Sequence, residues 1–100
     1  MAKKNSSNNN FLYKVKDETS SKIYPLLVEL VNDGRQDLAE QIKKIDYLLA
    51  YTSTCIKQKD FREARETIER VEARLEILKK EKVDTEYLEY LYVGIKSKIK

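Results

Sequence analysis

The side chains best able to act chemically in this 100-residue sequence are its seven tyrosines. The chain has two Phe and no Trp, so most of its aromatic rings carry a hydroxyl, a combination that suits helix boundaries and binding surfaces. Exposed tyrosines can contact a partner with the ring and form a hydrogen bond with the hydroxyl. The chemistry that they indicate is recognition, not the making or breaking of bonds.

Two clusters of these tyrosines are candidates for partner binding. At 100° per residue, Tyr47 lies opposite the apolar seam of its predicted helix and Tyr51 on the flank of that seam, in line with Lys44. Near the C-terminus Tyr90 points outward, with Tyr87 and Gly94 beside it. A helical glycine costs about 1 kcal/mol relative to alanine. The candidate partner-binding residues are therefore Lys44, Tyr47, Tyr51, Tyr87, Tyr90 and Gly94, although packing across helix boundaries would also explain Tyr51 and Tyr87.

Catalysis has few residues to draw on. The sequence has no His, which excludes imidazole general bases, Ser-His and Cys-His nucleophile pairs and His-containing zinc sites. The single cysteine, Cys55, cannot form an intrachain disulfide, and its place beside an apolar stripe predicts a buried small side chain. No phosphate-binding glycine loop, nucleophile elbow or metal-binding motif is present. We expect a protein that is not an enzyme, with no catalytic residue, no cofactor and no metal.

The positive charge of the chain lies at its N-terminus. Residues 1–16 contain four lysines and no acid: Lys3, Lys4, Lys14 and Lys16. Because the whole chain is +3, these four charges leave the remainder at −1. A duplex-binding domain is normally basic over a face of its folded body. Nucleic acid is therefore a less favoured partner than protein.

The sequence also predicts where the protein works. The polar run 5–10 stands where a signal peptide has its apolar stretch, and the longest uncharged run with apolar content, 47–56, is about half a membrane span. Together with the single cysteine, this favours a cytoplasmic protein without membrane contact. Many Lys, Glu, Ile and Tyr residues with few thermolabile side chains are also typical of thermophiles.

Four segments have the apolar spacing of amphipathic helices, at about 22–33, 35–58, 60–82 and 84–99. Pro25 fits the first turn of the first helix, and Gly34 marks its end. Asp60 is placed as an N-cap with Glu63 three residues later, as in a capping box. Short connections force consecutive helices to run antiparallel. The prediction is an all-α, up-down antiparallel four-helix bundle over 17–100, following a polar Lys/Asn-rich tail, 1–16, that we expect to be largely disordered.

A three-helix core with a short first helix is the main variant of this fold, and the strict seam of the third helix is coiled-coil-like. The residues expected in the core share the inward side of these helices. They are Leu27, Leu30, Ile42, Ile45, Leu49, Phe61, Ile68, Val71, Leu75, Leu88, Leu91 and Ile95.

The segment around the third helix start resembles one known repeat family. Lys59-Asp60-Phe61, followed by Ala64, Ile68 and Val71, is similar to the turn and second helix of a tetratricopeptide repeat, which has Gly where Lys59 stands. The resemblance covers about one repeat, and the residues 34 positions earlier do not share it. A stable array needs about three repeats. Any helix-turn-helix with heptad spacing would show much of this pattern, and we carry over no peptide-binding function from the resemblance.

The function that these observations favour is a non-catalytic helical-bundle protein that binds another protein, or its own copy as a homodimer. One alternative is a nucleic-acid-binding accessory protein that uses the lysine tail with Lys44, Tyr47 and Tyr51. Another is a small cytosolic inhibitor or immunity-type protein, for which a bundle of this size would serve.

Overall fold

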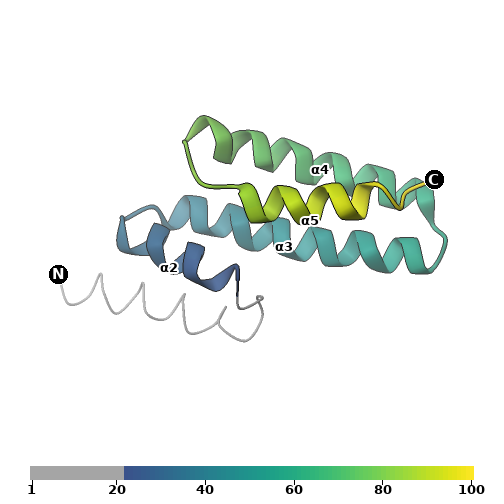
Figure 1. Ribbon diagram of the computed structural model, residues 1–100, viewed down its shortest axis with the longest axis horizontal. Helices are drawn as coiled ribbons and strands as arrows, with labels where there is room; N and C mark the ends of the chain where they lie inside the picture. The colour runs from purple at the N-terminus through teal and green to yellow at the C-terminus, as the bar shows by residue number, and fades with distance from the viewer. Residues whose placement is uncertain (1–21) are drawn as a thin grey trace. The chain divides into compact units, whose positions relative to one another are not determined.

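The computed structural model describes residues 22–100, and this part of the chain folds into four α-helices with no strand. The helices are α2 (Tyr24–Asn32), α3 (Gln36–Lys57), α4 (Phe61–Lys80) and α5 (Glu86–Lys96) (Figure 1). The predicted all-α fold with four helices is confirmed, and each predicted helix extends at most a few residues beyond the observed one. The predicted tail, 1–16, lies outside the described residues.

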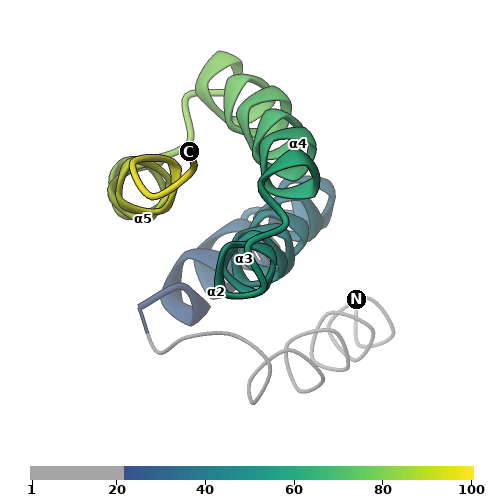
Figure 2. The ribbon, with the colours of Figure 1, turned by 90° about the vertical axis from the view of Figure 1, so that its right-hand side faces the viewer.

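The contacts within the chain define two compact units, whose boundary between Lys43 and Lys44 falls inside α3. In the first unit, α2 and the beginning of α3 run in opposite directions (Figure 1). In the second unit the remainder of α3, α4 and α5 follow one another in up-down-up order (Figure 1). Viewed along their axes, these three helices occupy the corners of a triangle (Figure 2). The antiparallel order follows from connections too short for a crossover.

The first helix begins and ends as its sequence predicts. Pro25 lies in the first turn of α2, where its missing N–H loses no helical hydrogen bond. Gly34 adopts the left-handed conformation, with φ 77°. Its N–H donates to the carbonyl of Val31 at 3.0 Å, and the N–H of Arg35 donates to that of Leu30 at 2.8 Å. This pair of bonds is the Schellman motif, which satisfies the last carbonyls of a helix.

The next two helices end with the same motif, but with lysine in place of glycine. Lys59 has φ 62° and Lys82 has φ 60°. After α3, the N–H of Lys59 donates to Ile56 at 2.9 Å and the N–H of Asp60 to Cys55 at 2.8 Å. The same two bonds follow α4, formed by Lys82 and the residue after it. An L side chain is strained in this conformation, so both lysines stand at positions that favour glycine.

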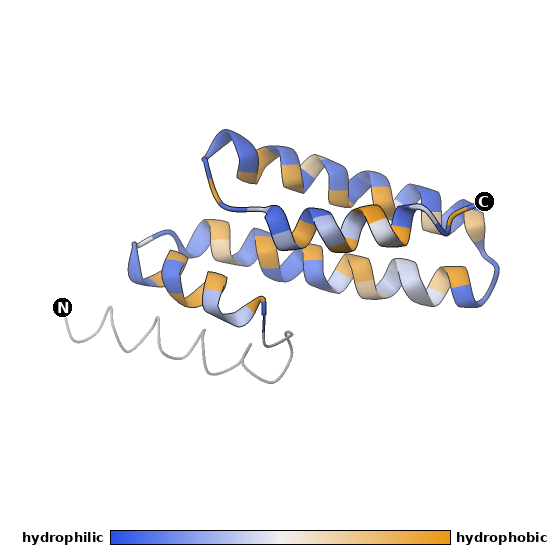
Figure 3. Ribbon diagram, viewed as in Figure 1, coloured by the Kyte–Doolittle hydropathy of each residue, from blue (hydrophilic) through white to orange (hydrophobic). Residues whose placement is uncertain are grey.

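Within each unit the buried side chains lie on the apolar side of the helices, and on α4 this side appears as orange bands on a blue ribbon (Figure 3). Eight of the twelve residues predicted for the core are buried, namely Leu27, Ile42, Ile45, Leu49, Ile68, Val71, Leu75 and Leu88. The other four, Leu30, Phe61, Leu91 and Ile95, are only half-buried, and for these the prediction was wrong. Two of them, Leu91 and Ile95, belong to α5, in which Leu88 is the one buried residue.

Polar groups inside this core are satisfied locally. The buried Thr52 hydroxyl donates to the carbonyl of Leu48 at 2.7 Å, and the Thr67 hydroxyl donates to that of Glu63 at 2.8 Å. Within residues 22–100, no buried side-chain nitrogen or oxygen lacks a hydrogen-bond partner. Each threonine therefore occupies a core position without an uncompensated desolvation cost.

Candidate functional site

The α3 cluster consists of Lys44, Tyr47 and Tyr51, all of which are exposed on one side of the helix. Tyr47 is 63% exposed and Tyr51 is 39% exposed. Their rings stack with centroids 6.5 Å apart and planes 11° from parallel. The sequence correctly placed Tyr47 away from the core and Tyr51 on its flank.

The hydroxyl of Tyr51 is held by the next helix. It donates to a carboxylate oxygen of Glu63 on α4 at 2.9 Å. This hydrogen bond to Glu63 raises the pKa of Tyr51 to about 12, because ionisation would place two negative charges together. The hydroxyl of Tyr51 is therefore bound within its own chain, whereas Tyr47 exposes most of its side chain to solvent.

This contact also corrects the predicted capping box. Asp60 does cap α4, since its carboxylate accepts the N–H of Glu63 at 3.2 Å. The second bond of a capping box, from the Asp60 N–H to the Glu63 carboxylate, is not formed. The Asp60 N–H donates instead to the carbonyl of Cys55 in the Schellman motif, and the Glu63 carboxylate accepts the Tyr51 hydroxyl. Glu63 thus links α3 to α4 instead of closing the cap.

The second cluster, which we call the α5 face, consists of Tyr87, Tyr90, Val93 and Gly94. Tyr90 is 74% exposed and Val93 is 61% exposed, while Tyr87 is half-buried. The rings of Tyr87 and Tyr90 stack with centroids 6.3 Å apart and planes 25° from parallel. The sequence identified the two tyrosines and the glycine, but it did not single out Val93, whose exposure completes the apolar surface.

Gly94 leaves open space on the α5 face. A Cβ atom added to it would meet nothing within 4 Å. The glycine borders a shallow groove along α5. The groove is lined by Glu86, Glu89, Tyr90, Leu91, Val93, Gly94, Ile95 and Lys98. Its middle is apolar, with acids near the start of the helix and a lysine just beyond its end.

The orientation of α5 is fixed by contacts with α4 that the sequence did not reveal. The carboxylate of Glu72 accepts hydrogen bonds from the Tyr92 hydroxyl and, at 2.8 Å, from the Lys96 ammonium, which also lies 3.0 Å from the Tyr92 oxygen. The Lys96 charge and the Tyr92 hydroxyl keep the pKa of Glu72 below its usual value. Tyr92 and Lys96 lie one turn apart on the same side of α5, and both bind Glu72 of α4. The opposite side of α5 therefore faces outward.

A second ion pair holds the beginning of the same helix. Glu89 on α5 pairs with Lys79 on α4 at 3.0 Å, and its carboxylate also accepts the hydroxyl of Thr85. The Thr85 hydroxyl and the Lys79 ammonium lower the pKa of Glu89. Both ends of α5 are thus tied to α4, which leaves Tyr90 and Val93 on the outward side.

Cys55 is a core residue, as its position in the sequence predicted. It is 3% exposed, and burial raises the pKa of its thiol. A redox or metal-binding cysteine needs exposure and a stabilised thiolate, which this environment does not provide.

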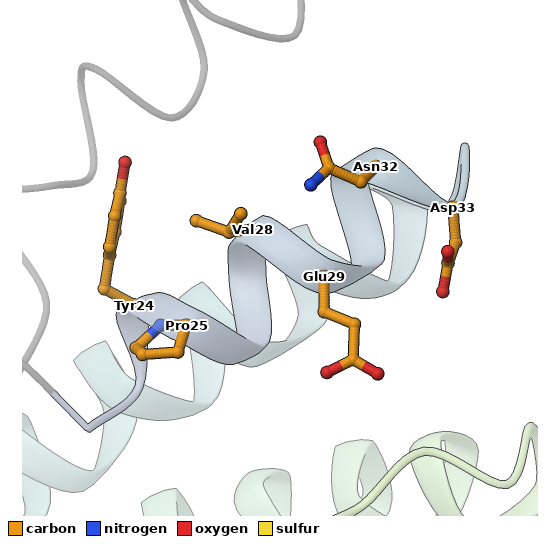
Figure 4. Close-up of a pocket in the computed structure, with 6 residues that line it drawn as sticks. All are labelled: Tyr24, Pro25, Val28, Glu29, Asn32 and Asp33. Atoms are coloured by element: carbon orange, nitrogen blue, oxygen red, sulfur yellow. The ribbon is translucent and has the colours of Figure 1, made fainter.

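One surface hollow was not foreseen from the sequence. It lies on α2 and is lined by Tyr24, Pro25, Val28, Glu29, Asn32 and Asp33 (Figure 4). Tyr24, Val28 and Asn32 project from one side of the helix, and the two acids project from the other (Figure 4). The described side chains around this hollow therefore point to different sides of α2 and not toward one shared position (Figure 4).

Two further properties of residues 22–100 bear on function. No three potential metal ligands gather in this part of the chain. None of its helices combines the length and the apolar character needed to cross a bilayer. In comparisons with protein families, curated proteins and solved structures, the chain matches none.

Proposed function

We propose that this chain is a small non-catalytic interaction protein that recognises another protein through the α5 face. The observation that carries this proposal is Gly94. It lies inside a helix, where glycine is about 1 kcal/mol less favourable than alanine. Its backbone does not have the positive φ seen at Gly34, and the space beside it is empty.

Neither backbone conformation nor packing within the described residues accounts for a glycine here. A glycine in a helix also allows another backbone or ring to approach closely. Tyr90 and Val93, the large apolar side chains that flank it, are both mostly exposed. Tyrosine is enriched among the residues that dominate binding energy at protein interfaces. The α5 face thus combines an exposed aromatic ring, an exposed aliphatic side chain and room for a partner.

The test is co-purification of partners from the native source with wild-type chain and with the double variant Tyr90→Ser/Val93→Ser. Both side chains are exposed, so the double variant should keep its stability within about 1 kcal/mol. Ile77→Ser is the matched control, because Ile77 is an apolar residue 43% exposed on α4. We expect the double variant to lose a protein partner that the control retains. Equal retention by all three proteins would contradict the proposal.

A second candidate function, nucleic-acid binding, is favoured by the Tyr47–Tyr51 pair. Two nearly parallel exposed rings form a surface on which bases stack. The four lysines of residues 1–16 would supply the phosphate contacts, which limits the slope of log K against log salt to about −3.6 for duplex DNA. Treating the lysate with nuclease separates the two functions, because only a nucleic-acid-dependent partner is then lost. In either case we propose a cytoplasmic location, in keeping with the single buried Cys55.

A further inference from the structure

We propose that the partner of the α5 face is a second copy of this chain, packed antiparallel about a two-fold axis that passes between Tyr90 and Gly94 at the level of residue 92. This inference rests on the proposed function, because it names the partner of the same face. A two-fold contact is isologous, so the face must be complementary to itself. Both the charges and the shape of α5 meet this condition.

The charges of α5 are divided between its two ends. Glu89 and Lys96 are already paired with Lys79 and Glu72 on α4, which leaves Glu86 in the first turn and Lys98 just beyond the last turn for the contact. An antiparallel copy brings the acidic end of one helix to the basic end of the other. A parallel copy would place like charges side by side, which is unfavourable. Glu86 and Lys98 border the groove on the α5 face, so part of this complementarity lies at the proposed contact.

The shape of the face is also complementary to itself. At 100° per residue, Val93, Tyr90 and Gly94 lie within a sector of about 100° around the helix. Residue 92 is midway between Tyr90 and Gly94 along the helix, so an axis at its level places each Tyr90 opposite Gly94 of the partner subunit. The open space beside Gly94 then receives the ring that Tyr90 exposes to solvent. Val93 lies about 80° around the helix from the midline between Tyr90 and Gly94, so it stands at the edge of the contact.

The size of the face sets the expected affinity. The 11 residues of α5 span about 16 Å, at about 1.5 Å per residue. A contact confined to such a helix buries less than the about 800 Å² per partner that is typical of stable complexes. We therefore expect a weak dimer, with a Kd of about 1 μM or higher.

The test is sedimentation equilibrium of the full chain at protein concentrations up to about 1 mM, where a dimer of this affinity is populated. Tyr90→Glu removes the ring that fills the space beside Gly94 of the partner subunit and should weaken association at least about tenfold. Ile77→Glu adds the same charge on α4 and should leave association unchanged. A chain that stays monomeric overturns the inference, and so does a dimer that Tyr90→Glu does not weaken. The lysate experiment above would still decide the proposed function in either case.

Oxidative cross-linking tests the antiparallel register. A mixture of the Tyr90→Cys and Gly94→Cys variants should form a disulfide between the two chains faster than either variant forms one with itself. Cys55 needs no replacement, because it is 3% exposed. Faster self-linking of each variant alone would show a parallel contact and refute the proposed arrangement.

Discussion

Replacing Lys59 with glycine should stabilise the protein, because Lys59 holds φ at 62° at the end of α3. The left-handed conformation costs an L residue about 1–2 kcal/mol. Glycine avoids this cost but loses about 0.4–1 kcal/mol more through the greater freedom of the unfolded chain. The net gain is therefore about 0.5–1 kcal/mol. It is also at this position that the tetratricopeptide pattern has glycine.

The effect of removing the Lys59 charge must be separated from the effect of relaxing its backbone conformation. Lys59→Ala removes the charge but keeps the Cβ atom, so the comparison of Lys59→Gly with Lys59→Ala isolates the conformational effect. We expect the glycine variant to be more stable by about 0.5–1 kcal/mol, or about 2–8 °C in Tm for a domain of this size. Thermal and urea unfolding followed by circular dichroism measure both quantities.

At a helical position the same comparison should give the opposite result, with glycine less stable than alanine. Lys57 lies in the last turn of α3 with helical backbone, so Lys57→Gly should be less stable than Lys57→Ala by about 1 kcal/mol. If Lys59→Gly is no more stable than Lys59→Ala, the chain does not leave α3 through a left-handed residue, and the reasoning about this turn fails.

Three further predictions concern the core, the α3 cluster and the α5 face. Ile68 is 3% exposed on α4, so Ile68→Ala should lower the free energy of unfolding by about 2–5 kcal/mol in urea, and a loss below about 1 kcal/mol would show that the α4 seam is not packed. Glu63→Gln should lower the pKa of Tyr51 from about 12 towards 10.0 in an ultraviolet titration, since the carboxylate that opposes ionisation is gone. In the wild type the raised pKa stabilises the fold below pH 10.0, and this contribution is lost as the pH rises towards 12. An unshifted titration would show that the Tyr51–Glu63 bond does not form. Gly94→Ala should raise the free energy of unfolding of the monomeric chain by up to about 1 kcal/mol, and therefore its Tm. A lower Tm would mean that the fold itself requires the glycine.

The helices could be predicted from the sequence because their apolar spacing is regular. Leu38, Ile42, Ile45 and Leu49 place one side of α3 in the core, and all four are buried. Leu91 and Ile95 have the same kind of spacing but are only half-buried. A periodic pattern shows which side of a helix turns inward, but not how many neighbours cover that side.

At the helix ends, residue type predicts a left-handed backbone conformation in one case and not in two others. Gly34 was recognisable as the end of α2 because glycine favours positive φ. Lys59 and Lys82 adopt the same conformation without any signal in their residue type, since lysine is common at every kind of exposed position. There the turn is held by backbone hydrogen bonds to the last carbonyls of the preceding helix, which any residue type can form.

The contacts that orient the candidate site were also beyond the sequence. Glu72 and Tyr92 are 20 residues apart, and only the packing of α5 on α4 brings them together. Glu63 was assigned to a capping box because that motif is local, whereas its actual partner, Tyr51, lies on the preceding helix. The outward direction of Tyr90 could be predicted, because it follows from helical geometry alone.

The central claim is that Gly94 serves a contact made by the α5 face and not the fold of the chain. The most direct test is the association constant of Gly94→Ala, measured by sedimentation equilibrium beside the wild type. We predict that it falls about tenfold or more, equivalent to about 1.4 kcal/mol, because a methyl group occupies the space for the ring of Tyr90. An association constant that is unchanged or higher in Gly94→Ala would contradict the claim.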